Sequence, residues 1–212
     1  PGSPIPEPLL DPADSPLTRV RLTDPVCTTV TIHRDTVPED ELADYLSSLI
    51  DCLMEVYDEP FAAAGLSLQQ PVLSPESGLD GSACVTNQDQ PDGWAGLYCG
   101  ANATIYYRTD WSPASPLNYV EVITHEFAHH LQHEADRVRQ AQRAAETVPN
   151  GAATVLELSR RVELQAECLS GVMVGPAGPL AVRSSELEEL FEARAAELPH
   201  WAQSHGTGRA QT

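Results

Sequence analysis

The feature that most constrains this chain is a pair of histidines spaced four residues apart within a long amphipathic segment. Residues 125–129, HEFAH, follow the pattern H-E-x-x-H. Residues four apart lie one turn above each other on an α-helix, about 5–6 Å between their Cβ atoms, so His125 and His129 can reach a single ion. Glu126 lies about 100° around the helix from His125, where its carboxylate can take a proton from a water molecule beside that ion.

The pattern is specific enough to favour a zinc site. With seven His and eighteen Glu among 212 residues, H-E-x-x-H is expected by chance about 0.02 times in the chain. The alternative is a histidine-rich amphipathic helix whose imidazoles contact only protein groups. We therefore expect one Zn²⁺ per chain, held by His125, His129 and a third protein ligand, with one position left open.

The third ligand has to come from another element. The extended metzincin motif would place Gly and His three and six residues after His129, where this chain has Gln132 and Ala135. His133 lies one turn further along, but three histidines on one straight helix cannot converge tetrahedrally on one ion. We therefore expect His133 and the adjacent His130 to lie at the surface or to support the ligands.

Two acidic residues further along the chain are candidates for this third ligand. Glu163 and Glu167 are four apart in a segment with apolar neighbours, namely Val162, Leu164, Ala166 and Leu169. A carboxylate at the boundary of an apolar stripe needs a partner, and a metal ion is a suitable one. Either residue can bind zinc while the other holds a ligand imidazole, so the residues alone leave the assignment open.

Composition excludes several other functions. The chain has 31 acidic and 12 basic side chains, a formal net charge of −19, and all the basic residues are Arg. Binding to nucleic acid requires a basic surface, which this chain lacks, so we expect no nucleic-acid partner. Anionic membranes are disfavoured for the same reason, and no apolar run is long enough to predict a membrane span.

Five cysteines suggest an oxidising compartment, because this number exceeds what a cytosolic enzyme of this size needs. Cys27 lies just before the helix that carries Cys52, and Cys84 and Cys99 flank a loop rich in Gly, Pro and Asp. We predict disulfides between these two pairs and a free thiol at Cys168. Two bridges can be chosen from five cysteines in fifteen ways, so position alone does not settle the pairing.

The local patterns predict an α+β fold with a small N-terminal sheet and later helices. A Pro-rich linker, or a segment added for expression, is expected over 1–18, a single domain over 19–205 and a flexible tail over 206–212. Strands are predicted at 26–32 and 103–109, with a long loop at 74–101 between them. Helices are predicted from a cap at Thr36 to about Val56 and over 117–145, 152–174 and 184–198.

Two segments resemble one known family. THEFAHHLQ at 124–132, followed by ELQAECLSG at 163–171, resembles the bacterial neutral zinc metallopeptidases, which share the zincin-like, gluzincin arrangement of thermolysin. LYC at 97–99 ahead of TIYY at 104–107 is similar to that family's strand before the active-site helix. HGT at 205–207 is similar to a motif near its C-terminus.

The resemblance implies roles for particular residues. Glu163 would be the third zinc ligand, and Glu167 would orient His125 at a position where the family usually has Asp. Strand 103–109 would form the sheet edge that pairs with a substrate backbone through Tyr106 and Tyr107. An oxyanion would be stabilised by His205, with Tyr106 as the second choice.

The resemblance also implies a function and a location. We expect a zinc-dependent peptidase that acts on peptide or protein substrates, with Glu126 as general base and later proton donor to the leaving amine. The alternative is a non-catalytic, zinc-stabilised surface protein that binds a peptide or partner without cleaving it. Family members are commonly exported, so we expect an extracytoplasmic protein, secreted or anchored at the cell surface through a removed N-terminal segment. The oligomeric state is left open.

Overall fold

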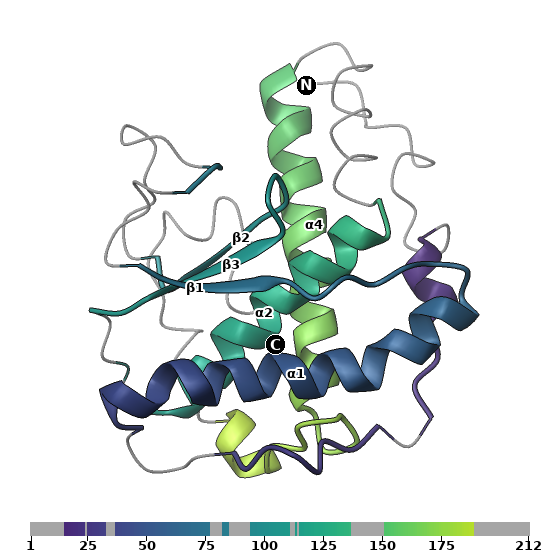
Figure 1. The fold of residues 1–212 in the computed structure, drawn as a ribbon. Coiled ribbons are helices and arrows are strands. Elements are labelled where there is room, and N and C mark those ends of the chain that lie inside the picture. The colour runs from purple at the N-terminus through teal and green to yellow at the C-terminus, as the bar shows by residue number, and fades with distance from the viewer. Residues whose placement is uncertain are drawn as a thin grey trace.

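The computed structural model describes residues 15–23, 25–32, 37–76, 82–84, 94–110, 113, 115–136 and 151–188. Their helices and strands confirm the predicted α+β class (Figure 1). In chain order they are the 3₁₀ helix η2 (Pro16–Arg19), α1 (Glu39–Ala63), β1 (Val72–Glu76), β2 (Gly96–Cys99), β3 (Thr104–Arg108), α2 (Leu117–Glu134) and α4 (Gly151–Val174).

The sheet has three strands in the order β1-β3-β2. β1 runs parallel to β3, with Val72 opposite Thr104, and β2 runs antiparallel to β3, with Gly96 opposite Tyr107. β3 consists of β-branched and aromatic residues apart from its last position, and its first four residues are buried. A strand of this composition suits the centre of a sheet, where both edges are paired.

The predicted loop over 74–101 is wrong at both of its ends, because β1 overlaps its start and β2 its end. β1 contains Pro75, and β2 begins at Gly96. Proline and glycine both have a low propensity for strands, so the sequence pattern favoured a loop here. Both strands lie at the sheet edges, where proline is tolerated because one side of the backbone needs no ladder partner. The middle of the predicted loop, 85–93, lies outside the described residues.

The predicted strand at 26–32 is also wrong, because this segment pairs with no strand in the described structure. A disulfide joins Cys27 to Cys52 of α1, and the Cys27 N–H donates to the carbonyl of Pro179 at 2.8 Å. Val30 and Ile32 pack against the core. This segment is therefore an extended stretch of chain that packs against the core and is joined to α1, not a strand of the sheet. Its composition is that of a strand, and composition alone does not show whether a neighbouring strand is present.

Helix α1 confirms the predicted apolar stripe. Pro38 precedes its first turn, which carries three acidic residues that interact favourably with the helix dipole. Its buried face includes Leu42, Leu46, Leu49 and Leu53. The helix runs beyond the predicted end to Ala63, where Gly65 adopts a positive φ of 78° that closes the last turn. The predicted cap at Thr36 lies outside the described residues.

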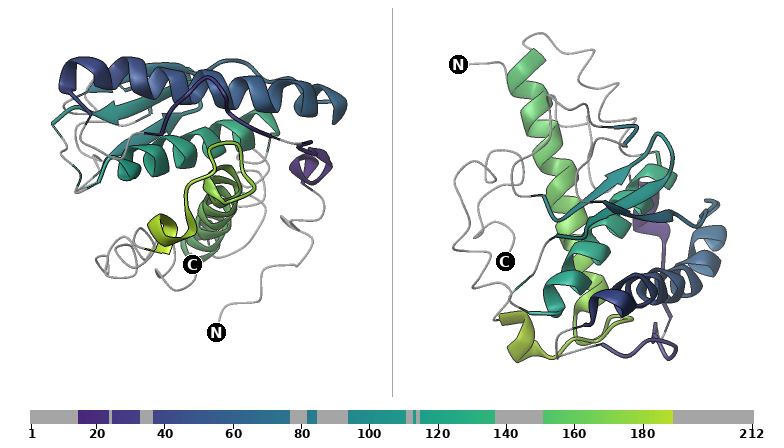
Figure 2. Two further views of the ribbon diagram at one scale, coloured as in Figure 1. Left: turned by 90° about the horizontal axis from the view of Figure 1, so that it is seen from below. Right: turned by 60° about the vertical axis from the view of Figure 1, so that its left-hand side comes forward.

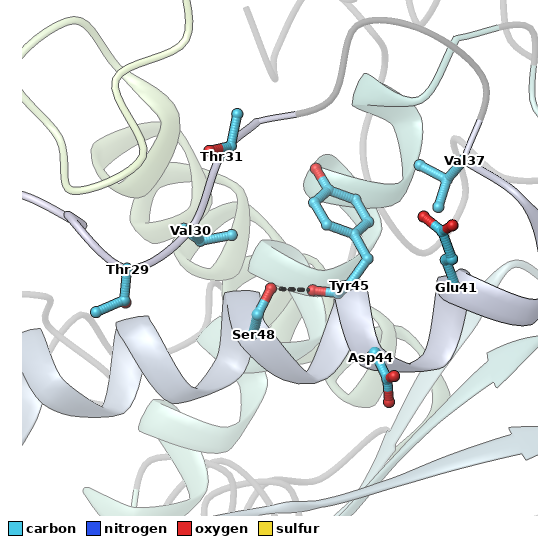
Figure 3. Close-up of a pocket in the computed structure, with 8 residues that line it drawn as sticks. All are labelled: Thr29, Val30, Thr31, Val37, Glu41, Asp44, Tyr45 and Ser48. Atoms are coloured by element: carbon cyan, nitrogen blue, oxygen red, sulfur yellow. Dashed lines mark hydrogen bonds between the residues drawn. The ribbon is translucent and has the colours of Figure 1, made fainter.

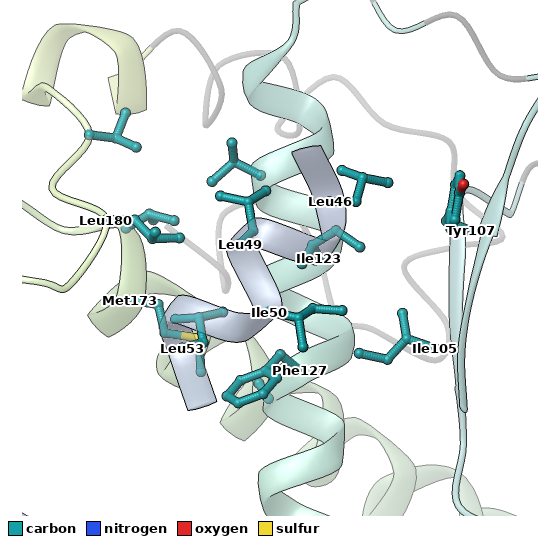
Figure 4. Packing of buried hydrophobic residues seen from close by; sticks show 14 of the residues in the cluster. Leu46, Leu49, Ile50, Leu53, Ile105, Tyr107, Ile123, Phe127, Met173 and Leu180 are labelled. Carbon is teal, nitrogen blue, oxygen red and sulfur yellow. The ribbon is translucent and has the colours of Figure 1, made fainter. Parts of the chain in front are cut away.

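Helix α2 is the centre of the fold. It contacts α1, α4, β2 and β3, and a view from below shows it between α1 and α4 (Figure 2). Figure 4 shows Ile123 and Phe127 of this helix in one cluster with leucines of α1, Ile105 of β3 and Met173 of α4. The face of α2 toward α1 is therefore fixed by packing, which determines where its other faces point.

Helix α2 is shorter than predicted. It ends at Glu134, because Ala135 caps it and Asp136 has a positive φ of 61°. The prediction of one helix to residue 145 is therefore wrong, and 137–150 lie outside the described residues. α4 agrees with the predicted helix at 152–174, and residues 184–188 are helical within the range predicted as 184–198.

The predicted linker extends too far into the folded chain. Ser15 is buried, and Thr18 donates a hydrogen bond from its hydroxyl to the Ser15 carbonyl at 2.7 Å. Leu17 packs against the core. Residues 15–18 therefore belong to the domain, while 1–14 and the predicted tail at 206–212 lie outside the described residues.

Both predicted disulfides are confirmed. Cys27 pairs with Cys52 and Cys84 with Cys99, each with Cα atoms 5.6 Å apart, and Cys168 is an exposed free thiol. Two disulfides are typical of proteins from oxidising, extracytoplasmic compartments. Among the described helices, none combines the length and the apolar character that crossing a membrane requires.

Candidate metal centre

The two motif histidines face each other on α2, as their spacing predicts. Nε2 of His125 lies 3.1 Å from Nε2 of His129. Ile123 and Phe127 turn toward the core, each with at most 1% of its surface exposed. The apolar stripe therefore directs the imidazoles to the opposite side of the helix, toward α4.

Glu163 of α4 completes the group. Its Oε2 atom lies 3.2 Å from His129 Nε2 and 3.4 Å from His125 Nε2. In a tetrahedral site with zinc–ligand distances of about 2.0–2.1 Å, neighbouring ligand atoms are about 3.3–3.4 Å apart. The three separations fit a zinc ion with two histidines and one carboxylate, and this is the only such group within the described residues.

The surroundings of these ligands favour positive charge. Burial lowers the pKa of His125, but the carboxylates of Glu163 and Glu167 outweigh it and raise this pKa to about 10. Burial likewise lowers the pKa of His129, and Glu163 more than compensates. For Glu163, burial raises the pKa, but the two histidines hold it well below its usual range. A divalent cation can replace the protons that this cluster otherwise attracts.

Glu167 lies on the other side of the His125 ring. Its Oε1 atom is 2.9 Å from His125 Nδ1, and its side chain is 9% exposed. A carboxylate at this nitrogen keeps the proton on Nδ1 and leaves the Nε2 lone pair for a metal. Glu163 thus lies at the Nε2 atoms of both histidines, and Glu167 lies at the other ring nitrogen of His125.

Glu126 lies beside the group, where the motif requires it. Its side chain is buried, and Oε2 accepts a hydrogen bond from the backbone N–H of Tyr98 at 2.6 Å. Burial is the largest influence on its pKa and raises it. A raised carboxyl pKa suits a general base that later returns its proton.

Sequence reasoning missed the part of β2 that faces Glu126. A Cβ atom added at Gly96 would lie 2.6 Å from Cγ1 of Val122 and 2.9 Å from Cγ of Glu126. A glycine is needed here because the strand passes so close to the helix. The signal was hidden because both Gly96 and Tyr98 fall in the segment predicted as a loop.

The two histidines after the motif do not reach the metal group. His130 is fully buried, with Nε2 donating to the Gln69 carbonyl at 2.6 Å and Nδ1 accepting from the Tyr98 hydroxyl at 3.1 Å. The ring of His133 packs edge-on against Tyr98. The carboxylate nearest both motif histidines comes from another helix, and a surface position for His130 is wrong.

Gln132 is a second residue whose role sequence reasoning missed. It is fully buried, and its Oε1 atom lies 2.9 Å from Nδ1 of His129. In the sequence it served only to exclude the metzincin pattern. The signal that could have found it is its position three residues after His129, within one turn on the same helix.

The strand that was expected to bind the substrate is not at the edge of the sheet, so this prediction is wrong. Strand 103–109 corresponds to β3, which lies between β1 and β2 and has no free edge. Tyr106 and Tyr107 are each only 4% exposed and pack in the interior, so the basis for assigning them to substrate pairing is lost. The Tyr106 hydroxyl accepts from Asn102 at 2.9 Å. His205 lies outside the described residues.

A hollow in the described structure lies away from the metal group (Figure 3). It is formed by the extended segment 29–31 and the first part of α1, with Glu41, Asp44, Tyr45 and Ser48 on the helix side. None of its lining residues belongs to α2 or α4. The hollow therefore contributes nothing to the histidine–glutamate group.

A helix carrying HExxH, crossed by a helix that supplies a glutamate, defines a zincin-like site of the gluzincin type. The model of the family described as “Putative neutral zinc metallopeptidase” matches residues 23–197, and the chain belongs to this family. Membership implies zinc as the metal, in agreement with the ligand set.

The curated relatives come from Escherichia coli. “Uncharacterized protein YpfJ” of strain K12 is 28% identical over 183 residues, which cover 81% of this chain and 61% of that protein. The protein of the same name from strain O6:H1 gives the same values. The chain therefore spans about three fifths of the length of these relatives. No solved structure matches the chain.

Proposed function

We propose that this protein is a zinc-dependent peptidase that hydrolyses peptide bonds in peptide or protein substrates. The observation that carries the proposal is the triangle of His125, His129 and Glu163, whose ligand atoms lie 3.1–3.4 Å apart beside the buried Glu126. A purely structural zinc site has no use for a carboxylate in that position. When bound, the zinc ion would activate a water molecule and polarise the scissile carbonyl.

The residues of the chain would transfer the protons and keep the reacting groups in position. Glu126 takes the proton from the attacking water and delivers it to the leaving amine, because its carboxylate is next to the ligands but not among them. Tyr98 fixes the carboxylate through its backbone N–H. Glu167 holds the imidazole of His125 in one orientation. The site would therefore be organised before a substrate arrives.

The outer edge of β2 is well placed to bind an extended peptide. The carbonyl of Ala95 accepts from the N–H of Arg108 in β3 at 2.9 Å. In an antiparallel ladder the bonding direction alternates along the strand, so the backbone groups of Gly96 and Tyr98 point away from β3. The bond from the Tyr98 N–H to Glu126 agrees with that direction. Because Glu126 already uses the N–H of Tyr98, a peptide added along this edge would pair with the remaining backbone groups of Gly96 and Tyr98, next to the general base.

The experiment is a cleavage assay with a quenched-fluorescent peptide library and two variants. Glu126→Gln should retain one zinc per chain while losing hydrolysis, by about 10²–10⁴-fold. His129→Ala should lose both zinc and hydrolysis. Retained hydrolysis in Glu126→Gln would contradict the mechanism. Peptide binding without any chelator-sensitive cleavage would instead support a zinc-stabilised binding protein.

We also propose that the protein works outside the cytoplasm, secreted or held at the cell surface. The support is the pair of disulfides, which reducing compartments do not maintain. Thiol labelling in intact cells of the native host tests this. Cys27, Cys52, Cys84 and Cys99 should resist alkylation until a reductant is added, and immediate labelling of all four would contradict the location.

A further inference from the structure

Gln132 links the second motif histidine to the helix that carries the third ligand. Its Oε1 atom lies 2.9 Å from Nδ1 of His129. Its Nε2 atom donates to the carbonyl of Val162 at 2.8 Å and to Oε1 of Gln165 at 3.0 Å. The side chain of Gln132 is fully buried, so these bonds replace those that water would make.

The orientation of this amide follows from hydrogen-bonding chemistry. The carbonyl oxygen of Val162 can only accept, so Gln132 has to present its NH₂ group there. Its Oε1 atom then faces His129, and because this oxygen can only accept, Nδ1 of His129 has to carry a proton. The other ring nitrogen, Nε2, is left with its lone pair directed at His125 and Glu163.

We propose that Gln132 is a positioning residue for the metal centre: it holds His129 as the Nδ1–H tautomer and fixes the ring relative to α4. It does for His129 what Glu167 does for His125. The proposal concerns metal binding, so it stands or falls independently of whether the substrate is a peptide.

The neutrality of Gln132 is part of its role. The carboxylates of Glu163 and Glu167 already match the two positive charges of Zn²⁺, and that of Glu126 lies beside them. A carboxylate at position 132 would add an uncompensated charge and would face the oxygens of Val162 and Gln165. The two imidazoles are therefore oriented by different partners, one charged and one neutral.

The test compares Gln132→Met with a matched control, Ser170→Ala. Ser170 makes another buried hydrogen bond between the same two helices, to Thr124 at 2.7 Å, without touching a ligand. We expect the zinc Kd, measured by competition with a chromophoric chelator, to rise about tenfold to a hundredfold in Gln132→Met. It should change less than about threefold in Ser170→Ala. Equal Kd values in Gln132→Met and wild type would overturn the proposal.

A spectroscopic readout separates positioning from general loosening. In the protein loaded with ¹¹³Cd, His129 should show metal coupling at Nε2 and a slowly exchanging proton at Nδ1. That proton should exchange faster in Gln132→Met but remain protected in Ser170→Ala, which leaves the partner of His129 in place. Coordination of the metal through Nδ1 in the wild type would refute the proposal even if Gln132→Met failed to fold.

Discussion

The backbone N–H of Tyr98 donates to Oε2 of Glu126 at 2.6 Å, which joins β2 to α2 beside the metal ligands. The position of the proposed general base therefore depends on the strand as well as on its own helix. Tyr98 is fixed at a second point, because its hydroxyl contacts His130, which in turn is held by the carbonyl of Gln69. Changes in β2 should thus disturb Glu126 without touching a ligand.

Gly96→Ala should reduce hydrolysis while leaving the metal in place. The new Cβ atom would lie 2.6 Å from Val122 and 2.9 Å from Glu126, so the strand or the carboxylate has to move. A displacement of about 1 Å from productive geometry can cost about 10²-fold in rate. We expect kcat to fall by about that factor, with one zinc still bound per chain.

The matched control for this variant is Gly171→Ala on α4. A Cβ atom there would meet nothing within 4 Å, and alanine is a better helix former than glycine by about 1 kcal/mol. Gly171→Ala should therefore keep full kcat and unfold at the same or higher urea concentration. Unchanged kcat in Gly96→Ala would show that β2 does not restrain Glu126.

Tyr98→Phe should separate stability from catalysis. It removes the hydroxyl that His130 Nδ1 accepts from, leaving a buried acceptor unpaired at a cost of about 1–3 kcal/mol. The backbone bond to Glu126 is retained, so kcat should change less than about tenfold at a temperature where the variant is folded. Urea unfolding and peptide hydrolysis measure the two effects. Wild-type stability would mean that this hydrogen bond contributes nothing net.

The ligands on α2 could be predicted because one short motif on one helix determines their geometry. His125, Glu126 and His129 need only helical spacing to be placed relative to one another. Glu163 was assigned by resemblance, since its contact with them depends on how α4 crosses α2, which no local pattern encodes. Tyr98 was missed because its partner Glu126 is 28 residues away in the sequence. Gln132 lies close to His129, but the bonds that fix its amide reach Val162 and Gln165, at least 30 residues away.

The fold shows the same division between local and long-range information. The apolar stripes of α1 and α4 predicted both helices, whereas the sheet was largely mispredicted. β3 was found from its composition but assigned to an edge, because strand order depends on distant pairings. Segment 26–32 has the composition of a strand, yet it packs against the core and is tied to α1 by a disulfide without joining the sheet.

Replacing Glu163 should affect zinc far more than replacing Glu167. Glu163→Ala removes one of three ligands, so we expect no stoichiometric zinc after dialysis against a weak chelator. Glu167→Ala leaves all three ligands but frees the His125 ring, which typically weakens metal affinity about tenfold to a hundredfold. Metal analysis by mass spectrometry measures both variants. Complete zinc loss in Glu167→Ala with retention in Glu163→Ala would reverse the assignment.

Zinc should stabilise the folded protein by an amount that depends on the ratio of free zinc to its Kd. At a free zinc concentration one hundred times the Kd, the free energy of unfolding should rise by about 2.7 kcal/mol. Glu126→Gln should show the same rise, because Glu126 is outside the ligand group. His129→Ala should show little. Thermal unfolding with zinc and with a chelator tests this, and a zinc-dependent shift retained in His129→Ala would place the metal elsewhere.

The two disulfides should differ in their effect on catalysis. Cys84–Cys99 closes a loop of sequence separation 15, worth about 3 kcal/mol in the unfolded-chain model. Cys99 ends β2, one residue after Tyr98, so replacing Cys84 and Cys99 by Ala should lower both the stability and kcat.

Replacing Cys27 and Cys52 by Ala should lower stability at least as much, because that loop is longer. It should leave kcat within about threefold at a temperature where the variant is folded, since this bridge lies on α1 and away from Glu126. An equal loss of kcat in both double variants would mean that overall stability, and not the anchoring of β2, sets the activity.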